Sequence, residues 1–139
     1  MDRYRAWTEA PSGAQRLNVG IVGGGLSGRF AARMLSDLGH DVTVYDKGRR
    51  ASGRLSDRTA DDGTPFQLGA PKLDGWPEWS ERHVQDWVER GFLEVDGERP
   101  GSTLPPLLDH LGEGLDVRQL HRVDGLESTS NGAQLRIIS

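Results

Sequence analysis

Residues 17–46 read LNVGIVGGGLSGRFAARMLSDLGHDVTVYD, and this stretch decides the fold. Its first six residues, Leu17 to Val22, form a short apolar run that predicts a β-strand, and three consecutive glycines end it. Residues 26–38 carry apolar side chains at helical spacing, and Gly39 stands where a glycine commonly ends a helix. Residues 41–45 alternate in polarity and predict a second strand. The stretch therefore predicts a βαβ unit of about thirty residues.

The turn between the first strand and the helix carries the motif Gly23-x-Gly25-x-x-Gly28. In such a motif Gly23 permits the tight turn, Gly25 lets the backbone approach a pyrophosphate, and Gly28 lets the helix lie close to the strands. The start of the helix attracts phosphate through its free N–H groups, and Asp46, at the end of the second strand, is placed to bind ribose hydroxyls. This order of elements predicts a dinucleotide site, and the acidic residue disfavours NADP. The alternative is a glycine-rich turn that binds nothing.

The remaining chain yields weaker expectations, which we state by residue range. They are a disordered lead at 1–16, a polar loop at 47–62, an extended piece at 66–70, a helix at 77–90, an extended piece at 92–95, a turn-rich linker at 97–106, a helix at 107–111, a third strand at 115–120, and a hairpin of 123–128 and 133–138 around Asn131-Gly132. We expect the three tryptophans at 76, 79 and 87 to pack in the core in preference to lining a substrate pocket.

Composition narrows the classes of function. The 139 residues predict about one domain, and the net charge of −4 does not favour a nucleic-acid partner. The chain has no cysteine, which excludes disulfides and thiolate metal sites and fits a cytoplasmic location. We see no signal peptide and no apolar stretch of membrane-spanning length. The four histidines lack metal-ligand spacing and are interpreted as surface or loop residues, and we expect no metal.

The loop after Asp46 carries a pattern that supports a more specific resemblance to a known family. It reads KGRRASGRL from Lys47 to Leu55, and an acidic residue followed by a loop ending in Gly-Arg resembles flavin-containing amine oxidases. Within that group the chain looks most like the renalase-like NAD(P)/FAD-dependent oxidoreductases. Residues 66–70, 84–91 and 100–123 are similar to later segments of the same family.

The resemblance implies an α/β fold, namely a truncated Rossmann-like FAD/NAD(P)-binding domain of the GR2 type at 17–139. The domain would include a β-hairpin, and residues 72–106 would begin a second, substrate-binding region. The implied cofactor is FAD. The cofactor-binding residues implied by the motif and the resemblance together are Gly23, Gly25, Leu26, Ser27, Gly28, Asp46, Lys47, Gly53, Arg54, Leu55, Gly69, Ala70 and Val123.

Some of these residues receive individual roles from the resemblance. Arg54 would contact the FAD pyrophosphate, for which a planar cationic fork is suited. Leu26 and Ser27 would donate backbone N–H groups to the phosphates, Gly53 would allow a close turn, and Val123 would bind the adenine through its backbone.

The same resemblance places Gly69 and Ala70 beside the isoalloxazine. The chain departs from the family at three nearby positions: Ser52 replaces a glycine, Leu55 a methionine and Gln67 an aspartate.

The largest departure is length, because a parallel sheet of this kind orders its strands 3-2-1-4-5 and the chain offers no fourth strand. The first strand would then be an exposed edge. We therefore expect a fragment, one half of a two-chain enzyme, or a homodimer that covers this edge.

The leading hypothesis for function is an FAD-dependent oxidoreductase that is incomplete alone. In it, hydride passes from a small amine or a dihydronicotinamide-type substrate to the flavin, and O₂ reoxidises the flavin. Alternatives are a non-catalytic dinucleotide-binding module that needs a partner chain, and a small NAD-binding regulatory domain. No catalytic residue can be named from the sequence.

Overall fold

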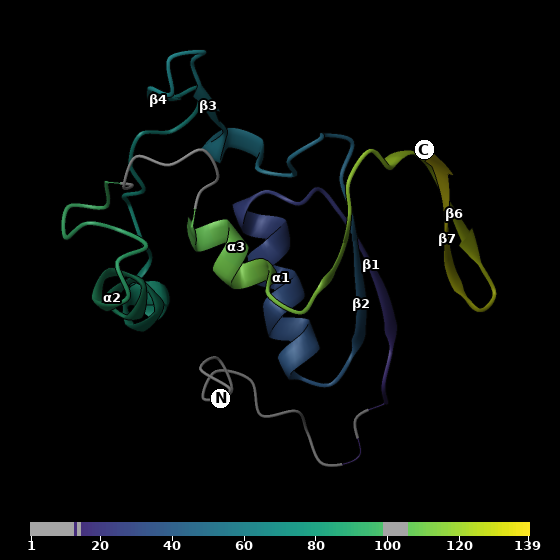
Figure 1. Ribbon diagram of the computed structural model, residues 1–139. Helices are drawn as coiled ribbons and strands as arrows, with labels where there is room; N and C mark the ends of the chain where they lie inside the picture. The colour runs from purple at the N-terminus through teal and green to yellow at the C-terminus, as the bar shows by residue number, and fades with distance from the viewer. Residues whose placement is uncertain (1–12, 14, 99–105) are drawn as a thin grey trace.

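The computed structural model describes residues 13, 15–98 and 106–139 (Figure 1). The greater part of the expected lead at 1–16, and the segment around Pro100-Gly101, lie outside the described residues. Within the described ranges, no helix combines the length and apolar character that crossing a membrane requires.

A three-stranded parallel sheet forms the centre of the fold, and its order is β1-β2-β5. The strands are β1 (Asn18–Val22), β2 (Asp41–Tyr45) and β5 (Asp116–Arg118), and helix α1 (Leu26–Asp37) connects the first two. Figure 1 shows α1 lying along one face of this sheet. The predicted βαβ unit and third strand are therefore confirmed, although the third strand is shorter than residues 115–120.

The ends and the buried face of α1 follow from its sequence. Ala32 of α1 and Val44 of β2 have no exposed surface, so small and β-branched side chains bring the helix close to the sheet. Gly39 adopts a φ of 91°, its N–H donates to the carbonyl of Ser36, and the N–H of His40 donates to the carbonyl of Leu35. These two bonds close the helix as a Schellman motif, as the glycine predicted.

β1 is an edge strand, because in the described part of the chain it pairs with β2 alone. The side chains of Leu17 and Val22 are 50% and 60% exposed at its two ends. The N–H of Gly23 donates to Tyr45 on β2, so the alternation of a parallel ladder turns the N–H groups of Asn18, Gly20 and Val22 toward the open edge. The expectation of an exposed first strand is confirmed.

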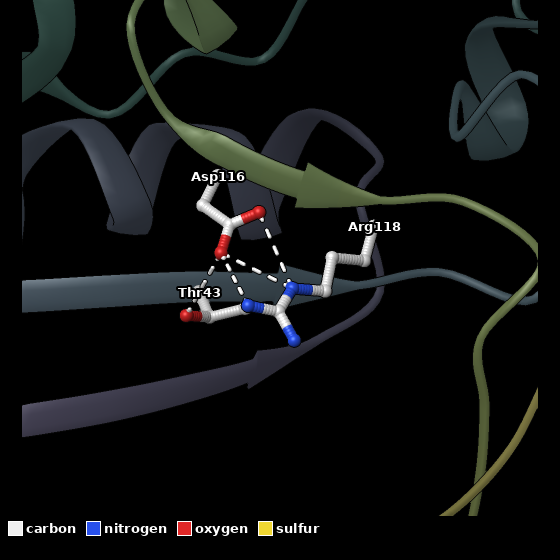
Figure 2. A network of polar contacts seen from close by, with 3 residues as sticks. All are labelled: Thr43, Asp116 and Arg118. Atoms are coloured by element: carbon white, nitrogen blue, oxygen red, sulfur yellow. Dashed lines mark hydrogen bonds and ion pairs between the residues drawn. The ribbon is translucent and has the colours of Figure 1, made fainter.

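A polar network covers part of the sheet face away from α1 (Figure 2). Arg118 donates from Nη2 to Oδ2 of Asp116 at 2.8 Å, and the hydroxyl of Thr43 donates to the same oxygen at 3.5 Å. The guanidinium of Arg118 also lies 5.7 Å from the centre of the Tyr45 ring. These contacts join β2 to β5, which is only three residues long.

The loop predicted at 47–62 is more ordered than its composition suggests. It contains a 3₁₀ turn, η2 (Gly53–Leu55), and strand β3 (Asp57–Thr59), which pairs antiparallel with β4 (Pro65–Gln67). The turn between these strands contains Asp62-Gly63, in which Gly63 has a φ of 87° and the Asp62 carboxylate accepts the N–H of Thr64. This dipeptide is a hairpin signal, and the sequence reading missed it.

The helix expected at 77–90 divides into a 3₁₀ turn, η3 (Glu78–Ser80), and α2 (Glu81–Glu89). The extended piece expected at 92–95 is wrong, because the N–H groups of Phe92 and Leu93 both turn back to the carbonyl of Trp87. That turn buries Leu93.

Trp87 and Leu93 form a core cluster with Leu107 and Leu111 of α3 (Pro106–Gly112). Phe30 of α1 packs edge-on against Trp87, with ring centroids 5.8 Å apart. The cluster therefore joins α1, α2 and α3 and confirms core packing for Trp87.

Two aromatic residues of this region contradict their sequence interpretation. Trp79 is 56% exposed and does not belong to the core. His83, interpreted as a surface or loop histidine, is only 2% exposed and meets Phe30 edge-on at 5.2 Å. Burial lowers the pKa of His83. Periodicity could have placed it, because residues 83 and 87 are one helical turn apart.

The chain ends in the predicted hairpin of β6 (Arg122–Thr129) and β7 (Gly132–Ile138). Gly132 has a φ of 133°, in agreement with the Asn-Gly turn signal. In Figure 1 the hairpin lies on the side of the sheet away from α1. Its Leu135 approaches Gly20 of β1 so closely that a Cβ there would lie 2.9 Å from Leu135 Cδ1.

Candidate functional site

Two of the three motif glycines are required by the protein itself. Gly23 has a φ of 101°, a conformation that favours glycine, and its N–H donates to the carbonyl of Tyr45 at 2.8 Å. A Cβ on Gly28 would lie 1.8 Å from the carbonyl oxygen of Gly23, so α1 could not lie this close to the loop with any other residue there. The predicted roles of a tight turn and a close helix are confirmed for these two positions.

Gly25 is different, because nothing in the protein demands a glycine there. Its φ of −71° and ψ of −169° are open to every residue. A Cβ would meet Gly53 Cα at 3.7 Å and Ser52 O at 3.9 Å, which are ordinary contacts. The open space lies at the start of α1, which no side chain caps. The absent side chain therefore leaves room for a group that approaches the first N–H groups of the helix.

Asp46, at the end of β2, holds the glycine loop (residues 23–28) in place through two hydrogen bonds. Its Oδ2 accepts the N–H of Gly24 and its Oδ1 accepts the N–H of Gly48, both at 2.7 Å. The sequence predicted a ribose-binding carboxylate and did not foresee this structural role. Each carboxylate oxygen keeps a further acceptor position, so the predicted role stays compatible with the observed one.

The arginine-containing loop (residues 47–55) packs directly on the glycine loop. Gly53, at a φ of 54°, lies so close that a Cβ on it would be 3.3 Å from Gly25 Cα. Arg54 follows within η2, and its side chain is exposed. The N–H of Ala70 donates to the carbonyl of Arg54 at 2.7 Å, and a Cβ on Gly69 would lie 1.9 Å from the same oxygen. Segments 53–55 and 69–70 therefore meet beside the glycine loop.

Two cavities open on either side of Gly23 and Gly53. The first, of about 560 Å³, is lined by Val22, Gly23, Gly25, Leu26, Ser27, Gly28, Gly53, Arg54, Leu55, Ala70 and Leu73. The second, of about 570 Å³, is lined by Val22, Gly23, Tyr45, Asp46, Lys47, Gly48, Gly53, Ser56, His121, Arg122 and Val123. They share three lining residues and together form a groove across the carboxyl end of β1, the usual place for a ligand in such a sheet. All of the predicted cofactor-binding residues except Gly69 line this groove.

The sequence missed residues that reach the groove from distant segments. His121 and Arg122 line the second cavity, because the N–H of Leu120 donates to Gly48 and that of His121 to Asp46. Leu120 takes a φ of 58°, which turns the chain from β5 over the end of β2. The only sequence signal was their place between a third strand and a hairpin.

A larger cavity, of about 820 Å³, lies elsewhere along α2 and contains no predicted site residue. Its lining residues include Trp76, Glu78, Glu81 and Glu89. No group of three or more metal-binding side chains is found in the described ranges. The groove over the glycine loop is therefore the candidate site, on the basis of its backbone donors and convergent loops.

The match of residues 21–90 assigns the family, which is that of the NAD(P)-binding Rossmann-like domains. The chain belongs to this family. This Rossmann-like domain is similar to the L-amino-acid oxidase of Trimeresurus stejnegeri, at 36% identity over 80 residues. It is also similar to the L-amino-acid oxidase of Gloydius blomhoffii, at 38% identity over 80 residues. Each match covers 57% of the chain and 15% of the relative, so the chain spans a small part of their length.

Solved structures agree with the fold. The Rossmann-like domain superposes on FqzB with a TM-score of 0.54 at 18% identity, covering 93% of the chain and 34% of that protein. It superposes on 2,6-dihydroxypyridine-3-hydroxylase from Arthrobacter nicotinovorans with a TM-score of 0.51 at 22% identity, covering 89% and 33%. The predicted Rossmann-like α/β fold is confirmed. The similarity to L-amino-acid oxidases over about 80 residues agrees with the predicted resemblance to flavin-containing amine oxidases. The narrower assignment to the renalase-like group stays a prediction.

Proposed function

We propose that the groove binds the ADP portion of FAD. The observation that carries the proposal is Gly25, whose missing side chain serves no need of the protein and leaves space at the uncapped start of α1. A diphosphate is the group that this position suits, because helix N-termini bind anions through free N–H groups. Arg54 lines the same cavity and supplies a cationic fork.

The two cavities suit the two halves of a dinucleotide. Asp46 and Val123 line the second cavity, where they would bind the ribose and the adenine. Leu55 and Ala70 line the first cavity, beyond the phosphates, and would face the start of the flavin half. A small NAD-binding domain would use Asp46 in the same way. We favour FAD because the loop ending in Gly53-Arg54 resembles that of flavin-containing amine oxidases.

For the longer or assembled protein we propose an FAD-dependent oxidoreductase that acts on a small amine or a dihydronicotinamide-type substrate. Similarity to L-amino-acid oxidases favours the amine. When bound, the flavin would supply the hydride chemistry, and the described residues would hold and orient it.

The alternative is a non-catalytic dinucleotide-binding module that works only with another chain. It is favoured by the open edge of β1, where N–H groups of three residues lack a partner strand in the described ranges. We propose that a further strand pairs there, from a longer form of this protein, a second copy or another subunit. An unpaired edge is otherwise a site of aggregation.

Titration calorimetry of the purified chain with FAD, ADP and NAD tests the proposal. We expect FAD and ADP to bind and NAD to bind more weakly, and we expect purified protein to carry the yellow colour of a flavin when FAD is supplied. A folded but colourless protein that binds neither FAD nor ADP would refute the site. Preference for NAD over FAD would support the regulatory-domain alternative.

A further inference from the structure

Arg29 is a buried cation that the sequence interpretation did not use. It lies in the first turns of α1, outside the apolar stripe of that helix, and yet it is only 7% exposed. Its guanidinium donates to three backbone carbonyls: Nε to Gly24 at 2.9 Å, Nη1 to Leu108 at 2.9 Å and Nη2 to Ala51 at 3.4 Å. One side chain therefore links the glycine loop, α3 and the loop that leads to Arg54.

Burying this charge is costly. Loss of water lowers the pKa of Arg29, and attraction to Asp109 and Asp46 opposes that shift. In the described ranges no carboxylate lies within ion-pair distance of the guanidinium. Room for it depends on Gly112 of α3, because a Cβ there would lie 2.5 Å from Nη1. An apolar side chain would avoid this penalty but could not bond three carbonyls.

The bond to Ala51 bears on the position of Arg54. Ala51 adopts a φ of 41°, which is uncommon for a residue other than glycine and carries strain. It is 2% exposed and lies against Gly24, where an added Cβ would be 2.9 Å from the Ala51 Cβ. Two residues later the chain reaches Gly53 and then Arg54. Arg29 therefore forms a hydrogen bond to a strained turn that lies just before Arg54, the residue that we propose to bind phosphate.

We propose that Arg29 is a positioning residue, which holds the glycine loop and the arginine-containing loop at the separation that lets Arg54 and the start of α1 bind one diphosphate. The inference rests on the proposed function. It predicts that Arg29 matters for ligands that touch both loops and matters little for adenosine, which would reach only the second cavity. It also predicts energetic coupling between Arg29 and Arg54.

The test measures ADP and adenosine binding by NMR titration for the wild type, one control variant and four test variants. The test variants are Arg29→Met, Arg29→Lys, Arg54→Met and the double variant Arg29→Met/Arg54→Met. We expect Arg29→Met to weaken ADP binding by about tenfold, the effect of roughly one lost charge-assisted hydrogen bond, and to leave adenosine binding within about twofold. We expect Arg54→Met to cost less in the double variant than alone, because without Arg29 its side chain no longer meets the phosphates.

Arg29→Lys separates position from charge and gives a second test should the Met variant unfold. It keeps a buried cation but loses the fork, so we expect a loss of ADP affinity close to that of Arg29→Met. The matched control is Arg33→Met. Arg33 lies one turn further along α1, donates to the carbonyl of Glu113 and pairs with Asp37, so ADP binding should stay unchanged.

The outcomes are distinct. If the wild type does not bind ADP, the proposed function itself fails. If the wild type binds ADP but Arg29→Lys binds it equally well, the positioning role fails while the proposed function stands. Equal losses of ADP and adenosine, or additive effects of the substitutions at 29 and 54, would also overturn it, because a merely structural role produces either result.

Discussion

Gly25 and Gly28 belong to one motif, but the structure assigns them opposite sensitivities to an added methyl group. For Gly25→Ala the backbone angles are permitted, and the new Cβ would lie 3.7 Å from Gly53 Cα and 3.9 Å from Ser52 O. Alanine also restricts the unfolded chain. Alanine is, however, a poorer N-cap than glycine, which offsets this gain, so we expect the free energy of unfolding to stay within about 1 kcal/mol of the wild-type value.

Ligand binding should respond in the other direction. The methyl group of Gly25→Ala enters the space at the start of α1, where we propose that the diphosphate approaches the helix N–H groups. Losing one hydrogen bond to a charged group costs about 1.5–3 kcal/mol. At about 1.4 kcal/mol for each tenfold change, the affinity for FAD and ADP should fall roughly 10- to 150-fold.

Gly28→Ala is the matched comparison. Its Cβ would lie 1.8 Å from the carbonyl oxygen and 3.0 Å from the carbonyl carbon of Gly23, and both are backbone atoms that cannot rotate away. Helix α1 must then move off the loop. We expect a loss of about 1–3 kcal/mol in the free energy of unfolding, in the range of overpacked cores, together with lost binding.

Urea unfolding followed by tryptophan fluorescence measures the stability of both variants, and calorimetry measures ADP and FAD binding. The reasoning predicts one variant that is stable but binds weakly, and one that is unstable. It is refuted if Gly25→Ala binds ADP as tightly as the wild type, because the open space would then serve no ligand. It is equally refuted if Gly25→Ala destabilises the protein as much as Gly28→Ala.

Three further predictions follow from other contacts. Asp46→Asn should lower the free energy of unfolding by about 1–2 kcal/mol, measured in urea, because one amide oxygen cannot accept both N–H bonds; an unchanged midpoint would contradict the fastening role. Hydrogen bonding and attraction to Arg118 lower the pKa of Asp116, so its stabilisation is present above about pH 4 and is lost as pH falls through the lowered value. Asp116→Asn should therefore be less stable than the wild type by at most about 1 kcal/mol at pH 7, and the difference should shrink as pH falls below about 4; a difference that stays constant in acid would exclude this cause. Asn18→Pro removes an N–H from the open edge of β1 and should reduce self-association in sedimentation while leaving ADP binding intact; a wild-type chain that is already a stable monomer would count against edge pairing.

Local patterns predicted the parts of the fold whose causes are local. The glycine run, the helical stripe of α1 and Gly39 lie next to the structure they determine, and the Asn131-Gly132 turn determines its own hairpin. The prediction for residues 92–95 failed because the path of this segment is set by bonds back to Trp87 and by the burial of Leu93 against α3. The bonds to Trp87 are local, but the leucines of α3 that pack with Leu93 lie in a later part of the sequence.

The candidate site likewise contains residues that local patterns located and residues that only long-range contacts place. The motif located the glycine loop and Asp46, but the second role of Asp46 requires its contact with Gly48, and the position of His121 requires the turn at Leu120. Arg29 was beyond reach because its bond to Leu108 spans 79 residues. The approach of α3 and of the loop at Ala51 buries it.

These long-range contacts limit what a loss of binding can reveal about this groove. The first cavity is built from segments near residues 25, 54 and 70, and their spacing depends on residues that the proposed ligand would not touch. Arg29 bonds only backbone, yet it fixes the turn before Arg54. A substitution can therefore abolish cofactor binding without removing a contact to the cofactor. Comparing ADP with adenosine separates the two cases, because only the diphosphate requires both loops at once.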